Sequence, residues 1–359
     1  MVVCYTGGGT LGHVYPALAV HEVLGHDANY EAFFIGRRDR QERELVERTG
    51  MPFYGIAAGK VRRYRSARNL ATPFLSALGF LHAMAILLRR RADVLFSKGG
   101  FVTPPVVLAA WLLGIPVISH ESDLTAGLAT RINSRFSRLV CTPTVEGYSA
   151  LKAKVVATGS PIRSSLLDYK RASAELPFLK EGEPLLLVLG GSKGATEINA
   201  LVHESLDELV KYAHVYHQCG PGKVIPVVKE RYTQVEFIDH LMPALLDRAD
   251  LVVSRAGANT IAELALFATP ALLIPLSPSF SRGDQVENAK ALAEHGAARV
   301  LLDQIDARTF ASEVRALLDD EAARRAYGNA IGTLAQPESA ALIADLIRGE
   351  KRRRSCSGE

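Results

Sequence analysis

A carboxylate, amides and small residues follow one strand-like run in the second half of the chain, where they could hold a nucleotide and a sugar. The apolar run 251–254 predicts a strand, the small residues 255–260 a turn, and the spacing of 261–267 a helix. In open α/β sheets, ligands bind beyond the carboxyl ends of strands, and a helix that starts there aims N–H groups at an anion. We expect Glu263, in the first turn of that helix, to accept hydrogen bonds from the hydroxyls of a ribose. A carboxylate that only complements the helix dipole is the alternative.

A glycine-rich segment, TGGGTLGH at residues 6–13, follows the first strand-like run and precedes a helix opened by Pro16. Its glycines fit the dinucleotide fingerprint G-x-G-x-x-G, and the arginine pair at 37–38 after the second strand is similar to an NADP signature. His13 lies at the mouth of the loop, where a cofactor pyrophosphate would crowd it. This placement argues against a dinucleotide-dependent enzyme.

A second glycine loop, LGGSKGA at 189–195, also follows a strand-like run and opens a helix. Glycines let backbone N–H groups approach a diphosphate, and Ser192 adds a hydroxyl donor. The Gly-Lys-Ser/Thr ending of a Walker loop is missing. A tight strand-to-helix turn that binds nothing is the alternative.

Two more polar loops, SKGGFVTP at 97–104 and HESDLTAG at 120–127, follow strand-like runs of the first half. We expect both at the same sheet edge as His13. A histidine on one rim with the carboxylates of Glu121 and Asp123 suggests proton transfer or hydroxyl binding. Exposed loop carboxylates without a role are the simpler alternative.

Strand-like runs alternate with helical ones along the chain, which predicts βαβ units with parallel sheets. The runs are hydrophobic on both faces, as in a sheet covered by helices, and they lie at residues 2–5, 32–35, 94–96, 117–120, 185–189, 215–217, 251–254 and 271–275. A length of 359 residues suits two domains. We therefore predict an α/β fold of two doubly wound, Rossmann-like domains with a cleft between them.

The polar stretch 164–183 separates the two series of strands and places a hinge near 163–168. Arg163, in the segment GSPIR, ends the first domain with a fixed cation. The expected divisions are a first domain at 1–163, a second at 164–335, a final helix at 336–350 and a disordered basic tail at 351–359.

The composition is that of a globular protein, with 48% apolar residues, 22% charged residues and a net charge of +4. No secretory signal is visible, and the four cysteines show no metal-ligand spacing. These features indicate a reducing cytoplasm and buried free thiols. No nucleic-acid partner is expected.

The apolar run 74–88 is shorter than the roughly 20 residues that span a bilayer. Basic residues flank it, at Arg89, Arg90 and Arg91 on one side and at Lys60, Arg62, Arg63, Arg65 and Arg68 on the other. This pattern predicts a face that docks on an anionic membrane. An ordinary core helix with solvated arginines is the alternative.

Taken together, these motifs resemble the MurG family of glycosyltransferases, in order and from residue 6 to about 346. The segments that carry the resemblance are GGGTLGH, SKGGF, HESD, GGSKG and SRGDQ. Leu11, Phe101 and Asp123 stand where other members have glycine, tyrosine and asparagine. Any role that needs the tyrosine hydroxyl or the asparagine amide therefore has no matching group at these positions of this chain.

The resemblance implies a GT-B fold, with an acceptor domain first, a nucleotide-sugar domain second and a C-terminal helix returning to the first. It implies transfer of GlcNAc, with inversion, from UDP-GlcNAc to the muramyl 4-hydroxyl of undecaprenyl-pyrophosphoryl-MurNAc-pentapeptide (lipid I). His13 is the expected base, because imidazole titrates near neutrality. Glu121 is a rival base, and His13 could instead bind phosphate or acceptor. The implied location is the cytoplasmic face of an anionic cell membrane, among cell-wall or division proteins.

The resemblance implies a particular contact for some residues and only a place in the site for others. In the second domain, Ile238 would meet uracil through its backbone, Glu263 the ribose, Gln285 the GlcNAc hydroxyls and Ser192 the diphosphate. The remaining candidates are Thr10, Leu11, Gly12, Phe101, Asp123, Arg163, Gly191, Arg255, Ala258, Asn259 and Thr260. No Asp-x-Asp occurs in the chain. We therefore expect no catalytic metal and no tightly bound cofactor, with UDP-GlcNAc as the donor substrate.

Two other classes of function remain open. One is the same fold with different chemistry, either another lipid glycosyltransferase or a UDP-GlcNAc epimerase. The other is a protein that binds a UDP-sugar or a lipid without catalysis. The presence of His13, Glu121 and Glu263 together argues against the second class.

Overall fold

The chain divides into two compact units in a computed structural model that describes residues 1–59, 71–169, 176–276, 283–302 and 305–356. The first unit comprises Met1–Ser164 and Pro337–Glu359, and the second comprises Ser165–Gln336. The first boundary thus lies one residue beyond the position expected from the sequence. The basic residues expected at 60–68, together with Ser281 and Arg282, lie outside the described residues.

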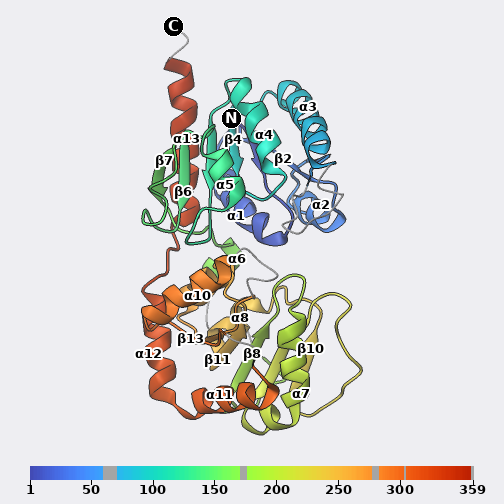
Figure 1. Ribbon diagram of the computed structural model, residues 1–359, viewed down its shortest axis with the longest axis vertical. Helices are drawn as coiled ribbons and strands as arrows, with labels where there is room; N and C mark the ends of the chain where they lie inside the picture. Colours follow the sequence, from blue (N-terminus) through green and yellow to red (C-terminus); the bar gives the residue numbers. More distant parts are fainter. Residues whose placement is uncertain (60–70, 170–175, 277–282, 303–304, 357–359) are drawn as a thin grey trace. The chain divides into compact units, whose positions relative to one another are not determined.

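The first unit is built on a parallel sheet of seven strands in the order β3-β2-β1-β4-β5-β6-β7 (Figure 1). The strands are β1 (Val2–Thr6), β2 (Glu31–Arg37), β3 (Phe53–Ile56), β4 (Val94–Ser97), β5 (Val117–His120), β6 (Leu139–Thr142) and β7 (Lys154–Ala157). The helices are α1 (Tyr15–Leu24), α2 (Arg40–Glu47), α3 (Thr72–Arg90), α4 (Thr103–Leu112), α5 (Leu128–Asn133), the short α6 (Ser164–Leu167) at the boundary, and α13 (Ser339–Cys356).

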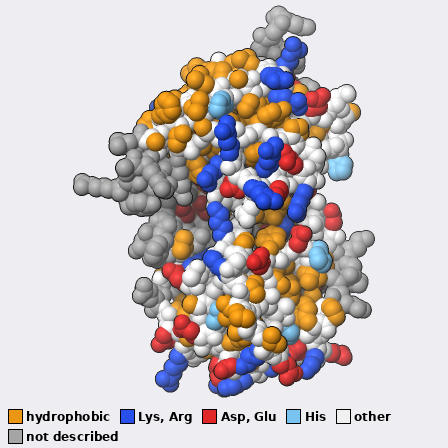
Figure 2. Space-filling view, turned by 90° about the vertical axis from the view of Figure 1, so that its right-hand side faces the viewer, with side chains coloured by type: hydrophobic (Ala, Val, Ile, Leu, Met, Phe, Trp, Pro, Cys, Tyr) orange, Lys and Arg blue, Asp and Glu red, His pale blue; other side chains and the backbone are white. Residues whose placement is uncertain are grey.

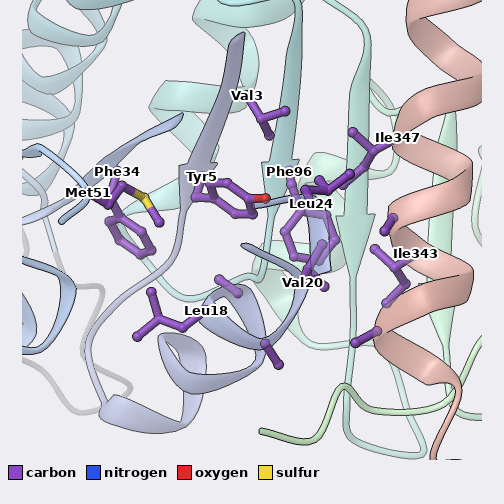
Figure 3. Close-up of a cluster of buried hydrophobic side chains, with 14 of the residues drawn as sticks. Val3, Tyr5, Leu18, Val20, Leu24, Phe34, Met51, Phe96, Ile343 and Ile347 are labelled. Carbon is purple, nitrogen blue, oxygen red and sulfur yellow. The ribbon is translucent and has the colours of Figure 1, made fainter. Parts of the chain in front are cut away.

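Both faces of this sheet are buried because successive side chains of a strand point to opposite sides. Val3 and Tyr5 of β1 pack into a cluster with α1 and α13, whereas Cys4 packs into another cluster with α3 and α4. Figure 3 shows Ile343 and Ile347 of α13 beside the side chains of α1 and β4. The doubly wound architecture follows directly from the uninterrupted apolar strands.

The C-terminal helix returns to the first unit, as the resemblance implied. In addition to its apolar face, Arg348 forms an ion pair with Asp27 at 2.7 Å, and Glu350 forms one with Arg138 at 3.0 Å. The helix is bounded at Cys356, whereas the tail was expected to begin at residue 351. Lysine and arginine are good helix formers, and cations are favourable near a helix C-terminus.

The second unit has a parallel sheet of six strands in the order β10-β9-β8-β11-β12-β13. Its strands are β8 (Leu185–Leu189), β9 (His214–Gln218), β10 (Tyr232–Val235), β11 (Leu251–Ser254), β12 (Ala271–Leu273) and β13 (Arg299–Val300). Its helices are α7 (Thr196–Tyr212), α8 (Met242–Arg248), α9 (Ala258–Phe267), α10 (Asp284–Glu294), α11 (Ala307–Asp319) and α12 (Glu321–Gly332). A core of β8, β9, β11, α7 and α11 side chains holds this unit together.

Helix α3 differs from the other helices in how much apolar surface it leaves exposed. Within the described residues, it is the one helix long and apolar enough to cross a membrane. The apolar run 74–88 lies within this helix, which is 19 residues long and ends in Arg89 and Arg90. Ala83 and Leu87 pack into the core, so one face of α3 belongs to the domain.

Candidate functional site

The first glycine loop lies where the strand order of the first sheet reverses. Strand β1 pairs with β2 on one side and with β4 on the other. Loops that leave the two central strands at such a point diverge and leave a crevice, the usual ligand position in doubly wound sheets. The loops at 7–12, 98–102 and 121–127 follow β1, β4 and β5, so they share the carboxyl edge, as the sequence predicted.

The loops after β1 and β4 are pressed together at glycine residues. A Cβ placed on Gly9 would come within 2.8 Å of the Phe101 ring, and one placed on Gly100 would collide with the carbonyl oxygen of Gly8. Gly9 and Gly100 have φ angles of 99° and 92°, which other residues rarely adopt. This packing brings half-buried His13 against Gly100, in a short 3₁₀ helix formed with Leu11 and Gly12.

Glu42 supports the first loop from below and was missed by the sequence analysis. The Gly9 N–H donates to its Oε1 at 2.6 Å, while its Oε2 has no hydrogen-bond partner among the described residues. Burial raises the pKa of this carboxyl group. Glu42 is an ordinary helix glutamate in the sequence, so no motif marks it, and only the fold reveals that it positions the loop.

Glu121 is an anchor of its own loop. Its Oε2 accepts hydrogen bonds from the Thr130 hydroxyl at 2.6 Å and from Gly127 N–H at 3.0 Å. Its Oε1 accepts from the N–H groups of Ser122 at 3.1 Å and Asp123 at 3.4 Å. The side chain is buried. Both oxygens are thus engaged in holding the loop 121–130, which weakens the case for Glu121 as a base.

A buried lysine also lies at this edge. Lys98 Nζ donates to the Ser122 hydroxyl at 2.7 Å. Burial lowers the pKa of Lys98 to about 8, and Glu121 and Asp123 oppose part of that effect. The lysine therefore ties the β4 loop to the β5 loop.

The other candidates of the first unit lie around this edge. Thr10 is exposed at the tip of the glycine loop, and Asp123 is half-buried and accepts, through its backbone carbonyl, a hydrogen bond from the Tyr148 hydroxyl. The Arg163 guanidinium lies over the Tyr15 ring, 4.7 Å from its centroid. The cation at the end of the domain is thus held against the helix that follows the glycine loop.

The second glycine loop occupies the equivalent position in the second unit. Strand β8 pairs with β9 and with β11, so the strand order reverses between the loop 190–195 and the turn 255–257. Gly191 and Gly194 have φ angles of 71° and 69°. Such a turn exposes consecutive N–H groups, as an anion site requires, and Ser192 is half-buried within it.

Gln218 connects two of the predicted donor contacts. Its Nε2 donates to the Gly191 carbonyl at 3.1 Å, and its Oε1 accepts from the Ile238 N–H at 2.8 Å. The sequence analysis missed Gln218 because it is the last residue of β9 and belongs to no motif. The Ile238 N–H is occupied by this bond, so any contact of this residue with a base would use another part of its backbone.

Arg255 has a structural set of partners. Its guanidinium donates to the carbonyls of Ile274 at 3.1 Å and Pro275 at 3.2 Å, and it pairs with Glu197 at 2.6 Å. These bonds join the ends of β11 and β12 to the start of α7. The arginine therefore shapes the edge on which a ligand would rest.

Helix α9 begins earlier than predicted, with Ala258, Asn259 and Thr260 in its first turn. Glu263 consequently lies in the second turn, so its predicted position in the first turn was wrong. Residues 258–260, predicted as part of a turn, are thus helical, and Gly257 is the extended N-cap residue. A carboxylate one turn inside the helix complements the dipole less, since that effect fades within the first turn.

Gln285 lies in the first turn of α10, and its Oε1 accepts a hydrogen bond from the Leu276 N–H at 2.9 Å. That bond fixes the orientation of the amide. Each sheet thus carries, at its own switch point, a glycine loop with polar side chains around it. Two doubly wound domains of this kind define the GT-B class of transferases.

The comparison with protein families agrees with this class. The Glycosyltransferase family 28 N-terminal domain matches residues 3–142, and the Glycosyltransferase family 28 C-terminal domain matches residues 185–342. The chain therefore belongs to glycosyltransferase family 28.

Curated relatives share most of their length with this chain. A protein of Lachnospira eligens is 42% identical over 351 residues, covering 96% of this chain and 98% of its own. A Clostridium botulinum protein is 38% identical with the same coverage. Both are named UDP-N-acetylglucosamine–N-acetylmuramyl-(pentapeptide) pyrophosphoryl-undecaprenol N-acetylglucosamine transferase.

Among solved structures, MurG of Acinetobacter baumannii superposes with a TM-score of 0.74 at 26% identity, covering 97% of this chain and 99% of that one. A UDP-GlcNAc 2-epimerase from Neisseria meningitidis superposes with a TM-score of 0.71 at 14% identity, covering 97% and 100%. The second likeness reflects the fold alone.

Proposed function

We propose that this chain transfers GlcNAc from UDP-GlcNAc to the muramyl 4-hydroxyl of undecaprenyl-pyrophosphoryl-MurNAc-pentapeptide. The observation that carries the proposal is the 38–42% identity, over 96% of the chain, to transferases named for this reaction. The matching motifs also coincide with the switch-point loops of both units, where a doubly wound sheet binds its ligands. The first unit would hold the lipid acceptor and the second the donor.

In the donor half, the N–H groups of Gly191 and Ser192 and the Ser192 hydroxyl would bind the diphosphate. The N–H groups of Gly190 and Gly194 donate instead to the carbonyls of Gln218 and Gly191. Gln218 would act as a positioning residue because it links Gly191 to Ile238. Glu263 would accept hydrogen bonds from the ribose hydroxyls, and Gln285 would donate its amide N–H to the GlcNAc.

The transfer is a single displacement with inversion. His13 removes the proton from the muramyl 4-hydroxyl, and that oxygen attacks the anomeric carbon of GlcNAc. The bond from this carbon to the diphosphate oxygen breaks, and UDP leaves with the electron pair. The glycine-loop N–H groups would stabilise the charge that develops on the leaving group.

His13 is preferred over Glu121 as the base because the Glu121 carboxylate is already engaged within its own loop. The carboxylate of Glu121 accepts four hydrogen bonds within its own loop. A base must be within reach of the acceptor proton, and His13 lies at the loop mouth. The alternative is that His13 binds phosphate without accepting a proton, and kinetic measurements on a His13 variant distinguish the two roles.

The exposed face of α3 would dock the enzyme on the cytoplasmic face of an anionic membrane. Phe74, Leu81 and Leu88 are 73%, 62% and 59% exposed. Trp111 and Leu112 at the end of α4 are also exposed, and α4 packs against α3. Figure 2 shows apolar side chains gathered on the first unit, with lysine and arginine side chains beside them. Apolar residues next to cations favour an anionic bilayer interface.

The test is the product formed by purified protein from UDP-GlcNAc and lipid I. Mass spectrometry should show the lipid acceptor heavier by one N-acetylhexosamine and an equal amount of UDP released. An unchanged lipid with epimerised UDP-sugar would instead indicate an epimerase, whose fold is similar. An unchanged lipid and unchanged nucleotide sugar, despite UDP-GlcNAc binding, would indicate a binding protein.

A further inference from the structure

The described part of the second unit brings together three side chains of the kind that bind metal ions. His203 comes from α7, His217 from β9, and Cys219 follows β9 directly. One ligand atom from each lies within 4.8 Å of the other two. His217 and Cys219 are fully buried and His203 is half-buried. The pair H-x-C in a strand carries no standard metal motif, so the sequence did not indicate this cluster.

Asn199 determines which nitrogen of His217 carries the proton. Its Nδ2 donates to the Cys219 carbonyl at 2.9 Å, so its Oδ1 is the acceptor that faces His217 Nε2 at 3.1 Å. Nε2 is therefore protonated, and Nδ1 carries a lone pair, which accepts from the Tyr232 hydroxyl at 3.1 Å. Metal-binding histidines are held in this way, with one nitrogen donating to an outer partner and the other directed at the ion. At His217 an ion would take the place of the Tyr232 hydroxyl proton at Nδ1.

His203 supplies a second, independent indication. Its Nε2 is buried and has no hydrogen-bond partner among the described residues. A buried polar atom left unsatisfied is costly, and structures usually provide it with a partner. The His203 and His217 rings are 5.5 Å apart between centroids, so one ion could satisfy both.

We propose that His203, His217 and Cys219 form a structural zinc site, with the Tyr232 hydroxyl or a water as the fourth ligand. Tetrahedral zinc, with bonds of about 2.0–2.1 Å to nitrogen and about 2.3 Å to sulfur, holds its ligand atoms roughly 3.3–3.6 Å apart. Small side-chain rotations would bring the three atoms to that spacing. Coordination converts the Cys219 thiol to a thiolate and releases its proton to water. Imidazole and thiolate ligands favour zinc over magnesium or calcium.

This site would lie below the second glycine loop. A Cβ on Gly194 would collide with the Cys219 carbonyl oxygen, so the loop rests directly on the segment that carries the ligand. The bound ion would stiffen that segment, and no step of the transfer reaction passes through it. The proposal is therefore independent of the proposed function.

The experiment is a titration of metal-free, tag-free, full-length protein with Co²⁺, which reports thiolate and tetrahedral coordination by its absorption bands. Wild type should show a thiolate charge-transfer band that saturates at one ion per chain and disappears when Zn²⁺ is added. Cys219→Ser should lose that band. His203→Gln should weaken Zn²⁺ binding by at least roughly tenfold, the scale on which even outer partners of metal ligands act.

Two control variants make the test specific. His295→Gln changes an exposed histidine of the same unit, and Cys356→Ser removes a thiol far along the chain; both should bind like wild type. Circular dichroism confirms that each variant is folded, and the half-buried position of His203 makes its variant the more tolerant one. The proposal is overturned if wild type shows no thiolate band, or if His203→Gln and Cys219→Ser both keep it.

Discussion

At the carboxyl edge of the first sheet, two side chains compete for the role of base, and their surroundings separate them. Glu121 is enclosed by four donors from its own loop, whereas His13 lies against Gly100 at the mouth of the glycine loop. In the second sheet, Arg255 and Gln218 likewise use their polar atoms to fix the site. Glu121, Arg255 and Gln218 thus hold the loops around the candidate sites in place.

His13→Ala should leave UDP-GlcNAc binding nearly unchanged and lower turnover by roughly 10²–10⁴, the usual contribution of a positioned base. The reason is that His13 belongs to the unit that would bind the acceptor. Steady-state kinetics and calorimetry with UDP measure the two effects. A variant that retains more than about a third of wild-type turnover, far above the range for a lost base, would rule out this role.

Glu263→Ala should weaken UDP binding by about 1.5–3 kcal/mol, the range for hydrogen bonds to a charged group. Its place in the second turn of α9 makes a pure dipole role less favourable than the sequence suggested. Calorimetry with UDP and with inorganic pyrophosphate, which has no ribose, tests the assignment: only the binding of UDP should weaken. If the dissociation constant for UDP does not change, Glu263 has no part in donor binding.

Lys98 predicts a particular pH dependence of stability. Its pKa is lowered to about 8 in the folded state, chiefly by burial, against about 10.4 when unfolded. Between these values the unfolded chain binds more protons, so the free energy of unfolding rises with pH across that window. Below pH 8 the folded protein carries the full cost of the buried charge. Lys98→Met should lack this rise.

Denaturation of the first unit at pH 7.5 and 9.5, in wild type and in Lys98→Met, isolates the effect of this group. Tyrosines and other groups that titrate there are common to both proteins and cancel in the comparison. The same pH dependence in both proteins would show that Lys98 titrates alike in the folded and unfolded states.

At the scale of elements, most interior strands were predictable and the edge strands were not. All eight strand-like runs form strands, and a helix follows the loop 189–195 directly, as predicted, beginning at Thr196. Strands β3, β7, β10 and β13 were missed, and each lies at an edge of its sheet. An edge strand pairs on one side only, so it can be short and partly polar, as Lys154–Ala157 is. Strand β6, a four-residue run, was missed as well.

The candidate site was predictable where sequence motifs mark its residues. Gly9 and Gly191 have positive φ angles, which glycine adopts readily and other residues rarely adopt. These glycines therefore mark their turns in the sequence. Glu42 and Gln218 have no such signature, because they act through contacts between residues far apart in the chain. Those contacts exist only once the sheet has formed.

The exposed face of α3 yields a prediction at this scale. Replacing Phe74, Leu81 and Leu88 by serine should lower binding to phosphatidylglycerol vesicles by at least about tenfold, because each side chain contributes apolar area to the interface. Activity on a soluble, short-chain acceptor should be preserved.

A matched control replaces three exposed apolar residues of the second unit, Val228, Leu302 and Leu334, by serine. This variant should sediment with vesicles like wild type. Equal pelleting of all three proteins at both low and high salt would exclude α3 as the docking face.

At the scale of the whole molecule, the chain builds the same kind of unit twice and then returns to the first. Each unit has its own parallel sheet, its own core and its own glycine loop at a strand-order reversal. Helix α13 completes the core of the first unit with Ile343 and Ile347. In the sequence, this helix follows the whole of the second unit. This organisation is compatible with the proposal that one unit holds the lipid acceptor and the other the donor.

The most direct test of this account is the linkage made in the product. NMR spectroscopy of the disaccharide released from the reaction of UDP-GlcNAc with lipid I gives both the anomeric configuration and the acceptor position. The account predicts a β-linked GlcNAc on the 4-oxygen of the muramyl residue, since a single displacement inverts the α-linked donor. An α linkage, or attachment at any other oxygen, would contradict it.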